Sequence, residues 1–293
     1  MNPVATVRTW AGMVKLSHTV FALPFALAGA TLAAADHGIE WRQLGWVVVA
    51  MFGARNAAMG FNRLVDQRID ARNPRTVGRE LPAGRLSRRA VWVATLALAV
   101  LFVFAAFRLN RVCGILSLPA LVIVLGYSYT KRFTWGSHLV LGLALALAPV
   151  GGYAAVAGGF SVALWWMAAG VLLWVAGFDV VYACQDVDFD RQARLRSIPA
   201  RFGLRGALAA ARVFHLAALA ALATVGPLAG LHPVYWAGIA VIAGLLIWEH
   251  RLVRADDLSR LGTAFFNMNG YISLVYLATM LAAVLLTLHA APG

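Results

Sequence analysis

Nine long apolar runs occupy most of the chain and constrain its fold more than any other feature. They cover residues 17–35, 44–65, 90–107, 112–127, 137–157, 163–183, 206–228, 233–248 and 265–289. Their apolar residues are continuous and do not alternate, and the runs are too long for barrel strands, so only helices satisfy their backbone hydrogen bonds in lipid. The sequence therefore predicts an all-α polytopic membrane protein with nine transmembrane helices around a central cavity.

The composition excludes a soluble globular protein. Hydrophobic residues make up 61% of the 293 residues and charged residues only 13%, whereas a soluble domain carries about 25% charged residues. So little polar surface cannot cover a water-soluble body. Because no linker or low-complexity tract interrupts the chain, we expect residues 1–293 to form one transmembrane domain.

The basic residues predict the orientation of the helices. A net charge of +13 would also suit nucleic-acid binding, but in a polytopic protein basic residues gather in cytoplasmic loops. Every even-numbered connection is basic here, which predicts a cytoplasmic N-terminus, an inner-membrane location and cytoplasmic cap loops at residues 72–89 and 191–205. The expected surroundings are the lipid bilayer, with neither nucleic acid nor an obligate protein partner.

Six of the 12 acidic residues lie in two short windows, at the ends of the second and sixth apolar runs. In the first window Asn62, Asp66 and Asp70 are spaced by four residues each. Residues four apart lie on one face of a helix, so these side chains form a ladder of oxygen ligands. Carboxylates grouped at the end of a membrane span are costly and are usually functional.

The second window repeats this pattern at the same predicted depth. Asp179, Tyr182, Asp186 and Asp190 are spaced by three, four and four residues, which places them on one helix face and turns Asp188 away. Mg²⁺ binds through a few carboxylates and leaves positions for water and phosphate oxygens. Two such ladders at the same cytoplasmic depth predict a magnesium site for a phosphorylated substrate.

A purely structural alternative is that these carboxylates form interfacial ion pairs with the arginines beside them in the sequence, namely Arg63, Arg68, Arg72, Arg191 and Arg194. Two windows that share period and depth favour the metal site over this alternative. The surrounding arginines add groups that bind phosphate well. Carboxylates for a metal beside arginines for an anion form the pattern expected for a diphosphate.

The two windows resemble the paired signatures of the UbiA superfamily of intramembrane prenyltransferases. The first signature is NRLVDQRID at residues 62–70, followed by NPRT at 73–76 and RELPAG at 79–84. The second is YACQDVDFD at residues 182–190, followed by SIPARFG at 197–203.

Two further segments, KLSHTVFALP at residues 15–24 and GYSYTKR at 126–132, are also similar to the family. The resemblance thus covers nearly the whole chain, and it is closest to the bacterial 4-hydroxybenzoate polyprenyltransferase branch. One departure is Arg63, where many members have a second Asp after the Asn. This arginine removes one possible metal ligand.

The resemblance implies Mg²⁺-dependent transfer of a polyprenyl group from polyprenyl diphosphate to a small aromatic acid in respiratory quinone biosynthesis. It implies that two Mg²⁺ ions are held by Asn62, Asp66, Asp70, Asp186 and Asp190. It also assigns catalytic roles to Asp66, Asp190, Tyr127 and Lys131.

The diphosphate is expected to contact five basic residues, Lys15, Arg75, Arg79, Lys131 and Arg201, some of them as the cap loops close. Each of three residues also has a non-catalytic interpretation. Tyr127 would then be an interfacial tyrosine, and Lys131 would only set the orientation of its helix. Lys15 would be a lysine whose ammonium group reaches the membrane interface. Arg55 lies seven residues before Asn62 on the same helix face, where the carboxylate of the acceptor or Asp179 is its expected partner. Asp179 and Tyr182 complete the predicted acceptor cavity.

The sequence leaves three other functions open. Within the family, the Asn-Arg form of the first motif is similar to relatives that prenylate a dihydroxynaphthoate for menaquinone, and tetrapyrrole acceptors are not excluded by composition. In another class, a secondary transporter also carries intramembrane charges. A transporter would place them at the bilayer midplane, whereas these lie at the predicted cytoplasmic ends of two spans, which favours 4-hydroxybenzoate prenylation.

Overall fold

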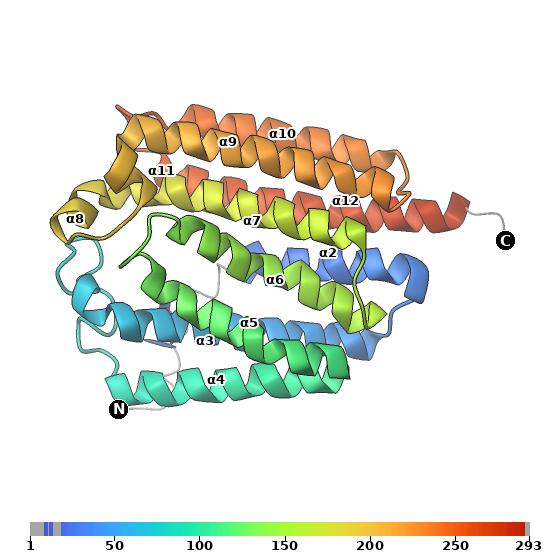
Figure 1. Ribbon diagram of the computed structural model, residues 1–293, viewed down its shortest axis with the longest axis horizontal. Coiled ribbons are helices and arrows are strands. Elements are labelled where there is room, and N and C mark those ends of the chain that lie inside the picture. The colour runs from blue at the N-terminus through green and yellow to red at the C-terminus, as the bar shows by residue number, and fades with distance from the viewer. Residues whose placement is uncertain (1–8, 11, 14–18, 291–293) are drawn as a thin grey trace.

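The computed structural model describes residues 9–10, 12–13 and 19–290, and this part of the chain is helical, with one isolated β-bridge between Arg254 and Asp257 (Figure 1). Among the described residues, nine helices have 19 residues or more: α2 (Thr19–His37), α3 (Trp41–Asp70), α4 (Arg88–Leu109), α5 (Arg111–Thr130), α6 (Ser137–Ala157), α7 (Val162–Ala183), α9 (Ile198–Leu228), α10 (Val234–Leu252) and α12 (Asn269–Ala290).

Seven candidate membrane spans are present in the described part of the chain, judged by length and apolar composition. Six of them coincide with α3, α4, α5, α6, α9 and α12, and the seventh covers Val162–Gln192, which includes α7. The prediction of a helical membrane protein is therefore confirmed. The count of nine spans is not, because α2 and α10 are not among the seven.

Short elements join the long helices at one end of the bundle. They are the 3₁₀ turn η2 (Cys184–Asp186), α8 (Val187–Gln192), α11 (Leu261–Thr263) and the π-helical turn η3 (Ala264–Met268). Figure 1 shows α8 and the loop between α3 and α4 together at the left end.

Helix α9 begins eight residues before the apolar run that predicts it. The Ser197 hydroxyl accepts a hydrogen bond from the Ala200 amide at 3.3 Å, and Pro199 suits the first turn of a helix. At Gly203 the backbone adopts φ 71° and ψ 175°, which kinks the helix and requires glycine. The predicted cap loop 191–205 is thus partly helical.

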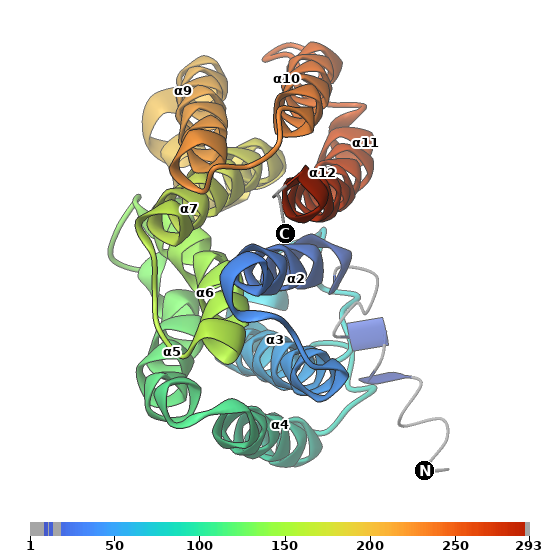
Figure 2. The same ribbon diagram turned by 90° about the vertical axis from the view of Figure 1, so that its right-hand side faces the viewer.

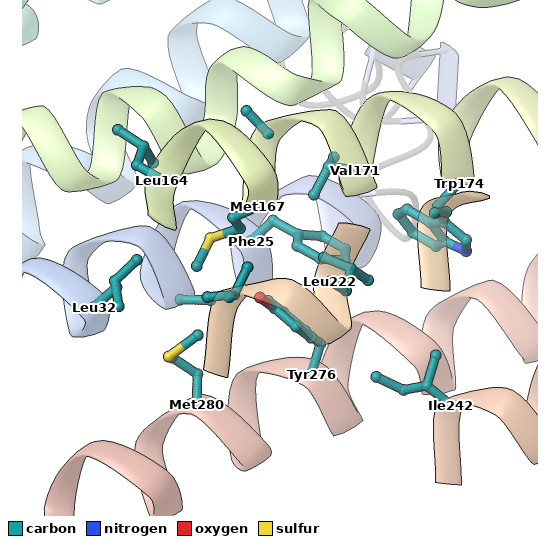
Figure 3. Close-up of a cluster of buried hydrophobic side chains, with 14 of the residues drawn as sticks. Phe25, Leu32, Leu164, Met167, Val171, Trp174, Leu222, Ile242, Tyr276 and Met280 are labelled. Carbon is teal, nitrogen blue, oxygen red and sulfur yellow. The ribbon is translucent and has the colours of Figure 1, made fainter. Parts of the chain in front are cut away.

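Helix α2 lies between two groups of helices and packs against α6 on one side and α12 on the other (Figure 2). One group is α3 to α6, and the other contains α7, α9, α10 and α12. The main hydrophobic core joins α2 to the second group (Figure 3). There the Phe25 ring lies 5.2 Å from Tyr276 and 5.0 Å from Trp174, which fixes α2 against α12 and α7.

The contact between α2 and α6 depends on two glycines that let the helix backbones approach closely. A Cβ atom on Gly152 would lie 1.9 Å from the Ala26 carbonyl oxygen, and one on Gly29 would lie 2.2 Å from that of Pro149. Small residues at helix interfaces are the usual means of such packing in membranes.

We expect Gly152→Ala to destabilise the protein by about 1–3 kcal/mol, because the added methyl forces the helices apart. Gly151→Ala is the matched control, since its Cβ would meet no atom within 4 Å and alanine is the better helix former. Thermal unfolding in detergent measures the difference. Equal unfolding temperatures for the two variants would show that the α2–α6 contact is not tight.

Candidate active site

The first predicted ladder lies on the last turns of α3. Asp66 and Asp70 are buried, with 2% and 5% of their surfaces exposed. The Asn62 side-chain amide donates to Asp66 Oδ2 at 3.1 Å and lies 3.5 Å from the Ser128 hydroxyl on α5. Asn62 and Asp66 therefore do share a face, as the four-residue spacing predicts.

Two basic residues at the end of α5 neutralise the buried Asp66. The Lys131 ammonium donates to Asp66 Oδ2, and Arg132 Nη2 donates to Oδ1 at 2.9 Å. Arg132 also donates to the Val65 carbonyl at 2.9 Å. Because a buried carboxylate is costly without counter-charges, these contacts fix α5 to the end of α3.

Asp70 is held by the loop that follows it. Arg79 Nη1 donates to Asp70 Oδ1 at 2.7 Å, and the Thr76 hydroxyl donates to the Asp70 carbonyl at 3.0 Å. The other carboxylate oxygen, Oδ2, is buried without a hydrogen-bond partner. This oxygen is available to a ligand.

The same loop reaches the second window and joins the two ladders. Asp186 Oδ1 accepts from the Asn73 amide and from Arg75 Nε, both at 2.9 Å, and Asp186 Oδ2 accepts from Arg75 Nη2. Arg75 Nη1 donates to the Tyr182 hydroxyl at 3.1 Å. Burial disfavours the charged guanidinium, but the hydrogen bonds and electrostatic interactions with Asp186 and Tyr182 together outweigh it and raise the pKa of Arg75.

The second ladder is not one continuous helix face, which corrects the sequence prediction. Helix α7 ends at Ala183, and the 3₁₀ turn η2 separates it from α8. The backbone of Asp186 at that junction has φ −107° and ψ 9°, outside the α-helical range. Asp190 accepts from the Ser197 hydroxyl at 2.8 Å, and Asp188 is exposed, as the spacing predicts.

Asp179 lies one turn before the end of α7 and pairs with His138 on α6. His138 Nδ1 lies 2.6 Å from Asp179 Oδ2, and His138 Nε2 accepts from the Ile198 amide at 3.3 Å. Because Nε2 is the acceptor, Nδ1 carries the hydrogen that is donated to Asp179. This buried contact connects α6, α7 and the start of α9.

An apolar cavity of about 760 Å³ extends from this region between α2, α3, α5, α6 and α7. Most of its lining is aliphatic, while Arg55, Ser117 and Tyr127 supply polar groups, and Phe178 supplies an aromatic ring. Tyr127 lies four residues before Lys131, and Arg55 lies seven before Asn62. The helix rise therefore places both roughly 6–10 Å inside the bundle from the charged cluster.

The two remaining predicted diphosphate ligands are Lys15 and Arg201. Lys15 lies outside the described residues. Arg201 is exposed and stacks over the Trp135 ring at 5.6 Å and the Phe202 ring at 5.4 Å. Its binding to a diphosphate stays a prediction.

The ion-pair partners of the carboxylates differ from those that the purely structural alternative predicts. Among the described residues, the ion-pair partners of Asp66, Asp70 and Asp186 come from the loop after α3 and the end of α5. They are not the adjacent arginines on which the structural alternative depended. The sequence prediction also omitted Asn73, Arg132 and His138, although Asn73 and Arg132 stand inside the quoted motifs.

The donor atoms suit Mg²⁺, which takes oxygen ligands from one or two carboxylates and from phosphates. In the described ranges, no three His, Cys, Asp or Glu residues converge closely enough to hold a metal alone. The free Oδ2 of Asp70 and the Asn62 and Asp190 oxygens supply the right ligand type. A metal here would need oxygens from a substrate as well.

The fold and the site place the protein in the class of helical membrane proteins that carry carboxylates and arginines beside an apolar cavity. The chain belongs to the UbiA prenyltransferase family, which matches residues 22–271. It is therefore a prenyltransferase, as the sequence motifs predict.

Relatives agree in sequence and in structure. The 4-hydroxybenzoate octaprenyltransferase of Aeromonas salmonicida (strain A449) is 32% identical over 234 residues, which are 80% of this chain and 81% of the relative. A UbiA homologue from Aeropyrum pernix K1 has a TM-score of 0.82 and 34% identity, covering 90% of this chain and 97% of that one. A homologue from Archaeoglobus fulgidus bound to DMAPP and Mg²⁺ shares the fold, with a TM-score of 0.71, 19% identity, and coverage of 94% and 99%.

Proposed function

We propose that the protein transfers a polyprenyl group from polyprenyl diphosphate to a hydroxylated aromatic acid, with 4-hydroxybenzoate as the acceptor, in respiratory quinone biosynthesis. The observation that carries the proposal is the contact of Arg75 and Asn73 with Asp186. This contact gathers carboxylates from both windows and loop arginines near the apolar cavity. The name of the Aeromonas salmonicida relative supports the acceptor.

The proposal includes an inner-membrane protein with nine spans and a cytoplasmic N-terminus. Helices α2 and α10 would complete the nine, since each has 19 residues and about 20 suffice to cross the hydrocarbon core. The charged cluster adjoins the arginine-rich loop between α3 and α4, and such loops face the cytoplasm. The active site would then receive cytosolic substrates.

Mg²⁺ would be held by Asn62, Asp66, Asp70, Asp186 and Asp190, and when bound it would neutralise the charge of the departing diphosphate. The homologue from Archaeoglobus fulgidus was solved with DMAPP and Mg²⁺, and a second structure of it with GPP and Mg²⁺.

The basic side chains now paired with these carboxylates have a second task in this proposal. Lys131, Arg75 and Arg79 would bind diphosphate oxygens, together with the predicted ligands Lys15 and Arg201. The loop after α3 covers the charged end and would keep water from the allylic cation, which water would quench. The apolar cavity would hold the isoprenoid chain.

Residues nearer the cavity would position the acceptor. Tyr127 lines the cavity four residues before Lys131, so its ring would lie beside the bond that breaks. Asp179 and Tyr182 are fixed by His138 and Arg75 and would form the wall of the acceptor site. Arg55 lines the apolar cavity and would pair with the acceptor carboxylate.

The test is an assay of the detergent-solubilised protein with Mg²⁺, geranyl diphosphate and a panel of acceptors. Prenylation of 4-hydroxybenzoate supports the proposal. Prenylation of only a dihydroxynaphthoate would establish the menaquinone alternative. Failure to prenylate any aromatic acid would overturn the assigned substrate class. Membership of a prenyltransferase family already disfavours a secondary transporter.

Arg55→Ala should raise the KM for 4-hydroxybenzoate roughly 10- to 100-fold, the value of one hydrogen-bonded charge pair. The KM for geranyl diphosphate should stay within about twofold, because the diphosphate site lies about two helical turns or more away. Arg55→Lys keeps the charge and should recover part of the loss. Steady-state kinetics with each substrate varied in turn separate the two constants. Equal effects on both would place Arg55 outside the acceptor site.

A further inference from the structure

Arg63 is the one buried charged residue of the first motif that the proposed chemistry leaves without a role. It lies on α3 between Asn62 and Asp66 and has only 6% of its surface exposed. Its Nε is buried without a hydrogen-bond partner. In the described part of the chain no carboxylate lies within ion-pair distance of it.

The titratable groups that interact electrostatically with Arg63 are Asp70, Arg79, Glu80 and Tyr127. The two acids have other partners, since Asp70 pairs with Arg79 at 2.7 Å and Glu80 lies 3.7 Å from Arg85. Asp70 still keeps one buried oxygen unpartnered. Arg63 thus stands beside a completed ion pair and does not belong to it.

Burial of a guanidinium without an anion is costly, and arginines in the membrane are normally paired. A purely structural arginine at this position would satisfy that cost within the protein, as Arg75 does with Asp186. The unpaired state of Arg63 therefore points to an anionic ligand.

The position of Arg63 on the helix selects the ligand. It precedes Asp66 by three residues and Asp70 by seven, so it lies on their side of α3, roughly 4.5 Å and 10.5 Å deeper. Arg55, the expected partner of the acceptor, lies eight residues deeper still. Arg63 accordingly lies closer along α3 to Asp66 and Asp70, which are assigned to the diphosphate site, than to Arg55, which is assigned to the acceptor.

We propose that Arg63 binds the diphosphate group of the donor from the bundle side of the first ladder. This inference rests on the proposed function. A guanidinium presents several N–H donors in a planar fork, which matches phosphate oxygens well. Where many family members carry a carboxylate, this chain would replace part of the metal's attraction for the substrate with a fixed cation.

The test is the affinity of the detergent-solubilised full chain for inorganic diphosphate in the presence of Mg²⁺, measured by isothermal titration calorimetry. Arg63→Met should weaken binding roughly 10- to 100-fold, and Arg63→Lys should weaken it less. Arg68→Met is the matched control, because Arg68 is exposed on the same helix five residues later. It should bind as the wild type does.

The affinity of the same variants for 4-hydroxybenzoate is a control for the fold, because general damage to the protein would lower this affinity too. Arg63→Met should bind 4-hydroxybenzoate as tightly as the wild type does. Wild-type affinity of Arg63→Met for diphosphate would overturn the inference and leave the proposed function standing. Loss of 4-hydroxybenzoate affinity alone would assign Arg63 to the acceptor instead. No diphosphate binding by the wild type would overturn both the inference and the proposed function.

If Arg63→Met unfolds, Arg63→Lys carries the test alone, because lysine keeps the charge but not the forked geometry. A selective loss of diphosphate affinity in the lysine variant supports the inference, and wild-type affinity contradicts it.

Discussion

Asp66→Asn will lower the rate of prenyl transfer by roughly 100-fold or more, the usual effect of removing one preorganised electrostatic group. Asp66 is 2% exposed and accepts hydrogen bonds from Lys131 and Arg132. In the proposed mechanism its carboxylate binds a metal while Lys131 binds the diphosphate. Asparagine keeps the shape but lacks the charge on which both tasks depend.

The control for this variant is thermal unfolding, because the loss of Asp66 leaves Lys131 and Arg132 without a counter-charge. Asp190→Ala tests the second ladder in the same assay and should cause a similar loss. Either variant would contradict the proposal that both ladders bind metal if it unfolds at the wild-type temperature and retains more than a tenth of the wild-type rate.

The long helices could be predicted from the sequence because each apolar run needs about one membrane thickness of helix. Boundaries inside the polar segments could not. Helix α9 begins at Ile198 because of the Ser197 cap, not because of any apolar pattern. The break between α7 and α8 could not be predicted either, because the spacing of the acidic residues also fits one continuous helix.

The sequence indicated candidate site residues, but it did not predict most of the contacts between them. A four-residue spacing predicts that Asn62 meets Asp66, since both lie on one helix. The pairing of Arg75 with Asp186 joins residues 111 positions apart, and no local pattern encodes such a contact. The His138–Asp179 pair was missed for the same reason, because a single histidine at the start of an apolar run gives no periodic signal.

Asp186 is the residue through which the loop after α3 contacts the second window, so its loss should affect both activity and structure. Asp186→Ala removes the acceptor of the Asn73 amide and of two Arg75 nitrogens. We expect prenyl transfer to fall roughly 100-fold or more. We also expect faster tryptic cleavage at Arg85, which is exposed in that loop, because the loop loses its contact with η2.

Asp188→Ala is the matched control, since Asp188 is exposed two residues further along. It should keep nearly wild-type activity and a wild-type rate of cleavage. Equal activities of the two variants would remove Asp186 from the site. Loss of activity in Asp186→Ala with an unchanged cleavage rate would mean that Asp186 binds the substrate complex but does not hold the loop. The activity and the cleavage rate thus separate two roles of Asp186. Metal binding depends on the carboxylate itself, whereas the position of the loop depends on the contacts of that carboxylate with Arg75 and Asn73.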